Sequence, residues 1–389
     1  MTSDPAPARC TTIYRRRDTV SNPVNARSPA TASEEGVADG QAQRSGPHRF
    51  AAVGAGRFAH LYHLPALLAH PRASLTMICD PTPSEHTVDL ARQADIPIVA
   101  DLDAVLQPDI CDAVVISTPD RLHAPQVRSA LEAGKHVLVD KPFVLDGATA
   151  RDLTSVAERD RLVTAVAFNQ RFSNAYLHAR RLVAEGELGV IRRVETIQLG
   201  GDWVISQDGS APRQTGPLRP AWYQDPELAG GGVLVGRGAH MADIVPWVLG
   251  RRPARLRAEV VPGLSGEVDR GGTADLDFGD LTWRFASLAD PAPLWDDVRI
   301  YGSAGRLEIR KPEGTLGFWS IAYGDIHDVV IPTPEPGIDT VAVDDFIEAI
   351  EGLHAPRCDF ASACTSVDIL EAMYLSAAEG GRWVSIGRP

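Results

Sequence analysis

Short apolar runs alternate with segments of helical spacing through the first part of the chain, beginning near Arg49. The apolar runs predict buried strands at 50–53, 75–79, 112–117 and 136–139. The intervening segments predict helices at 57–70, 84–94 and 123–133. Strands that alternate with helices in this way are typical of βαβ units. We therefore expect an α/β fold with a doubly wound parallel sheet of the Rossmann type.

The pattern changes after about residue 168. Segments 190–196 and 254–260 alternate apolar and polar residues, which is typical of antiparallel strands with one covered face. Helical spacing returns at 341–352 and 364–378. We expect a second, α+β domain on a mostly antiparallel sheet, with the Rossmann domain at 48–167 and the second domain at 168–389.

Residues 1–47 show no apolar periodicity and are rich in Ala, Pro, Ser, Thr and Arg. Such a segment buries too little apolar surface to offset the entropy of ordering it, so we expect a disordered tail. The cluster Arg15, Arg16 and Arg17 is either an interaction patch or a solvated part of that tail. Acidic residues in the tail, Asp4 and Glu34 among them, argue against a mitochondrial transit peptide.

Composition narrows the class of protein. The 389 residues carry 38 Lys and Arg against 51 Asp and Glu, a net charge of -13. This acidity argues against nucleic-acid and anionic-membrane binding. No apolar run reaches the roughly 18 residues of a membrane helix. No signal-peptide core follows Met1. The five cysteines fit neither a disulfide framework nor a zinc site, and the histidines are scattered, so we expect no metal and a soluble, cytoplasmic protein.

A glycine motif follows the first expected strand. Gly54, Gly56 and Ala59 fit G-x-G-x-x-G/A, in which the first glycine makes a tight turn and the second lets a pyrophosphate approach the helix N-terminus. Asp80 ends the second expected strand and suits the ribose hydroxyls of a dinucleotide. No Lys or Arg follows it closely, which favours NAD over NADP. The alternative is a Rossmann-type sheet that binds another nucleotide or none.

Two further segments lie where parallel strands end, which is where open α/β sheets bind ligands. The first is 117–123 and the second is 133–142, which contains Lys141. Lysine is rare in this chain: only Lys135, Lys141 and Lys311 occur among the 38 basic residues. In an arginine-rich background, each lysine is a candidate for a role that arginine cannot fill.

Taken together, these motifs resemble the glucose–fructose oxidoreductase / inositol dehydrogenase / MocA (Gfo/Idh/MocA) family. The resemblance covers about residues 49–389. The family more often has Asn at position 120 and Glu at position 140, where this chain has Asp120 and Asp140. The matching segments are 54–59, 63–67, 118–123, 133–137, 140–142, 168–172, 186–189, 230–243 and 301–305.

The resemblance implies NAD-dependent hydride transfer at a secondary alcohol of a sugar, a cyclitol or a derivative, in a homodimer or homotetramer. Lys141 and His240 would be catalytic, with His240 as the base because imidazole titrates near pH ~6.5. Four residues would contact substrate: Asp243, Arg171, Arg237 and Trp203. For Trp203 the alternative role is packing in the core. The cofactor would contact Gly54, Gly56, Arg57, Phe58, Ala59, Asp80, Ser117, Thr118, Pro119, His123, Asp140 and Lys141.

One position departs from the family pattern. The family has D-x-x-x-H, with the aspartate one turn before the histidine, and this chain has Gly236 in that place. Three interpretations follow: another acid such as Asp243 or Asp202 substitutes, the substrate needs less base assistance, or the chain is no longer a dehydrogenase. The last includes a glycoside hydrolase that uses NAD transiently and a non-catalytic NAD-binding regulator. Arg237 is either a site for an anionic substrate group or a surface arginine. The loop 206–220 is either a lid or an insertion.

Overall fold

The computed structural model describes residues 46–200, 221–263, 267–289, 295–311, 315–320, 326–330 and 340–387. From Gly46 onward the chain forms one compact unit. The tail expected at 1–47 therefore lies outside the described residues except for its last two. Among the described residues, no helix has the length and apolar character needed to cross a membrane.

The first part of the chain forms a parallel sheet, sheet A, with strand order β3-β2-β1-β4-β5-β6. This is the doubly wound arrangement that the sequence predicts. Alternate residues of β1 face opposite sides, so that Ala51 and Val53 join one apolar core while Phe50 and Ala52 join another. The strands are β1 His48–Val53, β2 Ala73–Cys79, β3 Ile98–Val99, β4 Ala113–Ile116, β5 His136–Val139 and β6 Thr164–Val166.

Helices connect these strands, and some of them begin at a residue whose side chain caps the first turn. The side chains of Ser84 and Asp146 accept hydrogen bonds from backbone N–H groups in the first turns of α2 and α5. A five-residue π-turn, η1, follows the glycine loop. The helical segments are η1 Ala59–His63, α1 Leu64–Ala69, α2 Glu85–Ala94, α3 Leu102–Val105, η2 Asp120–Leu122, α4 His123–Glu132, α5 Gly147–Arg159 and η3 Asn169–Phe172.

The second sheet, sheet B, has strand order β14-β13-β12-β11-β7-β10-β9-β8-β15. All its pairs are antiparallel except β10 with β7, which confirms the expected mostly antiparallel sheet. The strands are β7 Ile191–Leu199, β8 Arg255–Val260, β9 Gly271–Asp277, β10 Thr282–Leu288, β11 Trp295–Gly302, β12 Gly305–Lys311, β13 Thr315–Ser320, β14 Ile326–Val330 and β15 Val384–Ser385.

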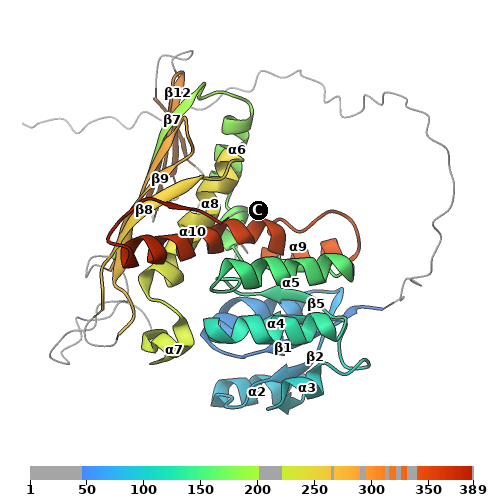
Figure 1. The fold of residues 1–389 in the computed structure, drawn as a ribbon. Coiled ribbons are helices and arrows are strands. Elements are labelled where there is room, and N and C mark those ends of the chain that lie inside the picture. Colours follow the sequence, from blue (N-terminus) through green and yellow to red (C-terminus); the bar gives the residue numbers. More distant parts are fainter. Residues whose placement is uncertain are drawn as a thin grey trace, which may run out of the picture. The chain divides into compact units, whose positions relative to one another are not determined.

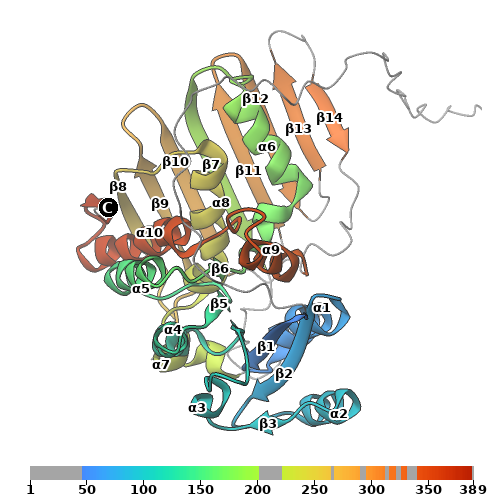
Figure 2. The same cartoon turned by 90° about the vertical axis from the view of Figure 1, so that its right-hand side faces the viewer.

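Helices α6 and α8 lie on one face of sheet B, as Figures 1 and 2 show. That face is apolar, with Trp283 and Phe285 of β10 fully or almost fully buried. The helical segments in this part of the chain are α6 Asn174–Ala184, η4 Ala221–Gln224, α7 Pro226–Ala229, η5 Leu234–Gly238, α8 Ala239–Leu249, α9 Val341–Ile350 and α10 Phe360–Ala378.

The last two helices pack against the first part of the chain. Val343, Phe346 and Ile347 of α9 are buried in the same apolar core as Phe50 of β1, and the rings of Phe50 and Phe346 lie 6.3 Å apart. Helix α10 packs against α5, α8 and β8, between the two sheets (Figure 1). The expected boundary at 167/168 follows β6 directly, but chain segments from both sides of it build the same cores.

Candidate active site

Four of the predicted cofactor residues lie along one rim of sheet A. Gly54 follows β1, Asp80 follows β2, Ser117 follows β4 and Asp140 follows β5. Because these strands are parallel, their carboxyl ends meet at the same edge. The strand order reverses between β1 and β4, and ligands of open α/β sheets bind at such a point.

The glycine loop after β1 has the geometry that a dinucleotide requires. Gly54 has a φ of +83°, and a Cβ atom added there would lie 2.6 Å from the carbonyl oxygen of Ser117. A Cβ added to Gly56 would meet no atom within 4 Å. Ala59 is buried and packs the following turn against the sheet. The loop therefore pairs a sterically closed first glycine with an open second one, which fits a pyrophosphate beside Gly56.

Asp80 is attached to this loop. Its Oδ2 accepts a hydrogen bond of 2.9 Å from the backbone N–H of Ala55, and its Oδ1 accepts one of 2.9 Å from that of Thr82. The carboxylate thus stands beside the loop, partly exposed, where it can accept from ribose hydroxyls. Arg57 is exposed and Phe58 is half-buried at the start of the same helix.

His123 ties together the loops after β4 and β5. It is fully buried, with Nε2 3.0 Å from the carbonyl oxygen of Thr118 and Nδ1 2.8 Å from that of Pro142. Pro119 lies between Thr118 and the short helix η2 that leads to His123. The segment 117–123 therefore forms part of the rim, and His123 holds the loop after β4 to the loop after β5 through the carbonyl groups of Thr118 and Pro142.

Lys141 joins sheet A to the helix that carries His240. Its Nζ donates a hydrogen bond of 2.7 Å to the carbonyl oxygen of Gly236. Gly236 lies in the π-turn η5, which runs directly into α8, where His240 occupies the first turn. The His240 ring contacts Phe168, just after β6, edge to face at 6.1 Å. The structure thus places the Lys141 ammonium at the π-turn that directly precedes the helix of His240, and such turns are often found at functional sites.

Gly236 stands where the family pattern has an aspartate. The structure places its backbone, instead of a carboxylate, against the Lys141 ammonium. The lysine therefore keeps an oxygen partner at this position although the side chain is missing. That arrangement orients Lys141 without adding a negative charge one turn before His240.

Arg171 and Asp243, both predicted to contact substrate, bind each other. Arg171 donates from Nε and from Nη2 to the two carboxylate oxygens of Asp243, at 2.9 and 2.5 Å. Only 3% and 1% of the two side chains are exposed. Burial raises the pKa of the Asp243 carboxyl, and Arg171 opposes that shift. Both carboxylate oxygens are satisfied and almost no surface is exposed, so the pair fixes η3 to α8, which points to a structural role.

Removing one partner of this pair tests that role. Asp243→Ala should lower the free energy of unfolding by about 3–5 kcal/mol, because Arg171 keeps a buried charge without its carboxylate. Urea unfolding measures the change. Asp275→Ala, which breaks the surface pairs with Arg257 and Arg284, is the control and should cost less than about 1 kcal/mol for each pair. A variant Asp243→Ala of normal stability but raised KM would instead place this carboxylate on the substrate.

Arg237 is also buried and paired. Its Nη2 donates to Asp296 Oδ1 at 2.8 Å, and its Nη1 donates to the carbonyl oxygen of Gly200 at 2.5 Å. The arginine thus ties η5 to β11 and to the end of β7, so it is not a surface residue. Trp203, Asp202 and the loop 206–220 lie outside the described residues.

Asp269 holds the turn that leads into η5, a role that no motif in the sequence indicates. Its carboxylate accepts hydrogen bonds from the backbone N–H groups of Gly232 at 2.6 Å and Leu234 at 3.1 Å, and from the Tyr374 hydroxyl at 2.6 Å. A Cβ on Gly232 would lie 1.9 Å from the Asp269 carbonyl oxygen. This close approach explains one glycine of the run 230–232 and fixes the start of the helix that carries His240.

His63 is a second residue whose role no motif indicates. It is buried beside Asp140, with Nε2 2.7 Å from Oδ1. The two residues are 77 positions apart, so no local pattern could pair them. Among the described residues, no group of three or more His, Cys, Asp or Glu side chains is arranged to hold a metal ion.

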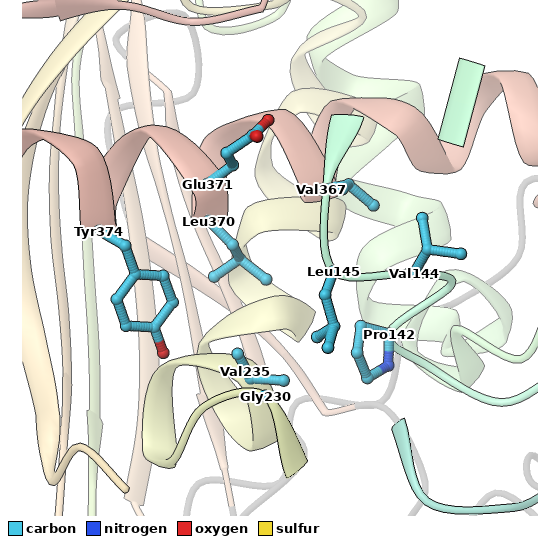
Figure 3. Close-up of a pocket in the computed structure, with 9 residues that line it drawn as sticks. All are labelled: Pro142, Val144, Leu145, Gly230, Val235, Val367, Leu370, Glu371 and Tyr374. Atoms are coloured by element: carbon cyan, nitrogen blue, oxygen red, sulfur yellow. The ribbon is translucent and has the colours of Figure 1, made fainter. Parts of the chain in front are cut away.

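A small cavity of about 40 Å³ lies behind Pro142. Figure 3 shows its lining from three segments: Pro142, Val144 and Leu145 after β5, Gly230 and Val235 near η5, and Val367, Leu370, Glu371 and Tyr374 on α10. The cavity has room for about one water molecule, so it is too small for a sugar.

Two models of known protein families match this chain. Residues 48–168 match the oxidoreductase family with an NAD-binding Rossmann fold, and residues 176–308 match the GFO/IDH/MocA C-terminal domain. The chain belongs to the GFO/IDH/MocA family of oxidoreductases. The resemblance drawn from the motifs is thereby confirmed. In this family member, the described rim of sheet A is part of an NAD-binding domain.

Individual relatives agree with this assignment. D-glucoside 3-dehydrogenase of Escherichia coli K12 is 31% identical over 54% of this chain and 56% of its own length. Inositol 2-dehydrogenase of Rhizobium meliloti is 25% identical over 69% of this chain and 74% of its own length. The chain spans about half the length of the curated relatives that it matches at about 30% identity.

Solved structures share the fold. An oxidoreductase domain protein from Kribbella flavida superposes with a TM-score of 0.78 at 24% identity, over 89% of this chain and all of its own. Levoglucosan dehydrogenase in complex with NADH gives a TM-score of 0.75 at 21% identity, over 88% of this chain and all of its own. At these identities, the likeness concerns the fold.

Proposed function

We propose that this protein is a dehydrogenase that oxidises a secondary alcohol of a sugar, cyclitol or derivative with NAD, reversibly. The observation that carries the proposal is the 2.7 Å hydrogen bond between Lys141 and the Gly236 carbonyl. It places an ammonium group from the rim of the NAD-binding sheet at the turn that precedes His240. The names of the glucoside and inositol dehydrogenase relatives support the substrate class.

Two side chains of this protein, His240 and Lys141, would act on the substrate hydroxyl. When bound, NAD⁺ accepts a hydride from the carbinol carbon. His240 would take the proton of the substrate hydroxyl, and Lys141 would donate a hydrogen bond to the same oxygen and stabilise the negative charge that develops there. The products are then a ketone, reduced cofactor and a proton held on His240. Lysine suits this task better than arginine because its compact ammonium concentrates the positive charge at one atom, and one of its N–H donors can point at the reacting oxygen.

The cofactor would lie along the rim of sheet A. Gly54 and Gly56 would hold its pyrophosphate at the start of the helix, and Asp80 would accept from the adenosine ribose. A carboxylate at that position repels a 2′-phosphate, so we propose NAD in preference to NADP. Arg171 and Asp243 would support α8, and Arg237 would support η5, without contacting substrate.

A panel assay tests the proposed reaction. Purified protein is mixed with NAD and, in parallel, with sugars, cyclitols and sugar acids, and the absorbance of reduced nicotinamide is followed. The proposal expects turnover with at least one member of the panel. Bound NAD with no net reduction across the panel would instead support hydrolysis through transient oxidation or a regulatory role.

Cofactor preference depends on the charge of Asp80. Asp80→Asn keeps an oxygen that can accept from Ala55 but removes the negative charge. Because hydrogen bonds to charged groups contribute about 1.5–3 kcal/mol, the ratio of kcat/KM for NAD over NADP should fall about tenfold or more. Glu85→Gln, a charge removed from the first turn of α2, is the matched control. An unchanged ratio in Asp80→Asn would remove this residue from the account of specificity.

We also propose that the protein forms a homodimer or homotetramer. In Figure 1 the described helices lie on one side of sheet B, which leaves its other face open. Ile197 and Trp295 are each 40% exposed, on strands β7 and β11. Light scattering gives the mass in solution, and a mass of one chain would refute the proposal.

A further inference from the structure

A buried histidine connects the helix after the glycine loop to the strand end that carries Lys141. His63 is the last residue of the π-turn η1, and only 1% of it is exposed. Its Nε2 lies 2.7 Å from Oδ1 of Asp140, the residue directly before Lys141. The contact therefore joins the helical segment after the glycine loop to the end of β5, directly before Lys141.

The Asp140 carboxylate is held on both of its oxygens. Oδ1 meets His63, and Oδ2 accepts a hydrogen bond of 2.5 Å from the Ser117 hydroxyl at the end of β4. Burial by itself raises the pKa of this carboxyl, but the attraction and hydrogen bond of His63 and the hydrogen bond of Ser117 outweigh it, so the pKa lies below its ordinary value. Asp140 is thus an ionised, immobilised group.

Lys141 is anchored on the other side as well. The carbonyl oxygen of the next residue, Pro142, lies 2.8 Å from Nδ1 of His123. Both neighbours of Lys141, Asp140 and Pro142, are therefore held by hydrogen bonds, while its four-carbon side chain extends to the Gly236 carbonyl oxygen. A long side chain of this kind has many rotamers, and a fixed backbone limits where its ammonium can stand.

We propose that His63 is a positioning residue for Lys141: it clamps Asp140, together with Ser117, and so sets the place of the lysine ammonium at η5. The catalytic consequence rests on the proposed function, whereas the positioning itself does not. Stability alone does not account for the histidine. Its Nδ1 is buried without a hydrogen-bond partner among the described residues, and a buried polar atom of that kind costs free energy. A buried pair of polar side chains is seldom more stabilising than apolar side chains of similar volume.

Lysine labelling tests the placement without a substrate. The full chain is treated with an amine-acetylating reagent, and modification of Lys141 and Lys135 is followed by peptide mass spectrometry. Lys135 is the internal control, because its buried Nζ is held by the carbonyl groups of Gln107 and Cys111. His63→Leu removes the clamp. It should speed Lys141 labelling about tenfold, the equivalent of one charge-assisted hydrogen bond, and leave Lys135 unchanged.

Three further variants sharpen the result. His63→Gln can still donate to Asp140 and should restore slow labelling, while His70→Leu, a histidine just after α1, should have no effect. Ser117→Ala removes the other donor to Asp140 and should speed Lys141 labelling several-fold. If faster Lys135 labelling shows that the His63→Leu protein is unfolded, Ser117→Ala takes its place as the test. Equal Lys141 labelling in wild type and in a folded His63→Leu or Ser117→Ala overturns the proposal.

Kinetics separate positioning from a general structural defect. With the best substrate of the panel, His63→Leu should lower kcat about 10- to 100-fold, because a misplacement of about 1 Å costs that much. KM and the Kd for NAD should change little, and His63→Gln should recover most of the kcat. A loss confined to KM or to NAD binding would contradict the role. Failure of every panel substrate would refute the dehydrogenase and leave the labelling result standing.

Discussion

Replacing Lys141 with alanine should abolish most turnover while leaving the cofactor bound. The ammonium is the group that the structure places at the turn before His240, so its loss removes a charge-stabilising donor from the reacting oxygen. Such groups contribute about 10²–10⁴-fold in rate, and we expect kcat to fall within that range. The Kd for NAD, measured by fluorescence titration, should change by no more than a few-fold, because Gly54, Gly56 and Asp80 are untouched.

Two other lysine substitutions serve as controls. Lys141→Arg keeps a positive charge but replaces the compact ammonium with a planar fork, so it should recover little activity. Lys135→Met removes the lysine at the opposite end of β5, where Nζ binds the carbonyl groups of Gln107 and Cys111. It should lower stability and leave kcat close to the wild-type value. A Lys141→Ala enzyme with wild-type kcat would show that the catalytic assignment is wrong.

The two loop glycines should respond differently to the same substitution. Gly54→Ala forces a side chain onto a residue with φ of +83° and sets its Cβ 2.6 Å from a backbone oxygen, so the protein should lose stability and NAD binding together. The strain of positive φ alone costs about 1–2 kcal/mol. Gly56→Ala meets no atom within 4 Å, so its melting temperature should stay near that of the wild type.

NAD affinity completes this comparison. The open space beside Gly56 is where a pyrophosphate would approach the backbone, so Gly56→Ala should weaken NAD binding about tenfold or more. Calorimetric melting and NAD titration of the same samples give both quantities. A Gly56→Ala protein that binds NAD as tightly as the wild type would move the pyrophosphate away from this loop.

The fold was largely predictable because its elements depend on local patterns. The buried strand 136–139 was predicted with the bounds that the structure gives. The helix expected at 57–70 is present, but a π-turn occupies 59–63 of it, and periodicity does not reveal an added residue in one turn. The packing of α9 onto the first sheet was not predictable, because it joins Phe346 to Phe50 across most of the chain.

The candidate site was predictable only where a motif marks it. Lys141 and His240 came from segments with a recognisable pattern, and the structure brings these segments together. Arg171 and Asp243 belong to such segments as well, yet they bind each other, because a motif does not show which way a buried side chain faces. His63 lies in a matching segment and Asp269 does not, but no pattern reveals the partners of either residue, because those partners are distant in sequence. The contacts of these two residues are visible only in the folded structure.

The most direct test of the proposed reaction is to follow a labelled hydride. The best panel substrate, deuterated at its carbinol carbons, is incubated with NAD and the wild-type protein, and the nicotinamide product is analysed by mass spectrometry and NMR. Hydride transfer predicts one deuterium at C4 of the reduced nicotinamide and an equal amount of ketone. Substrate consumption without deuterium in the cofactor, or with no reduced cofactor at all, would contradict it.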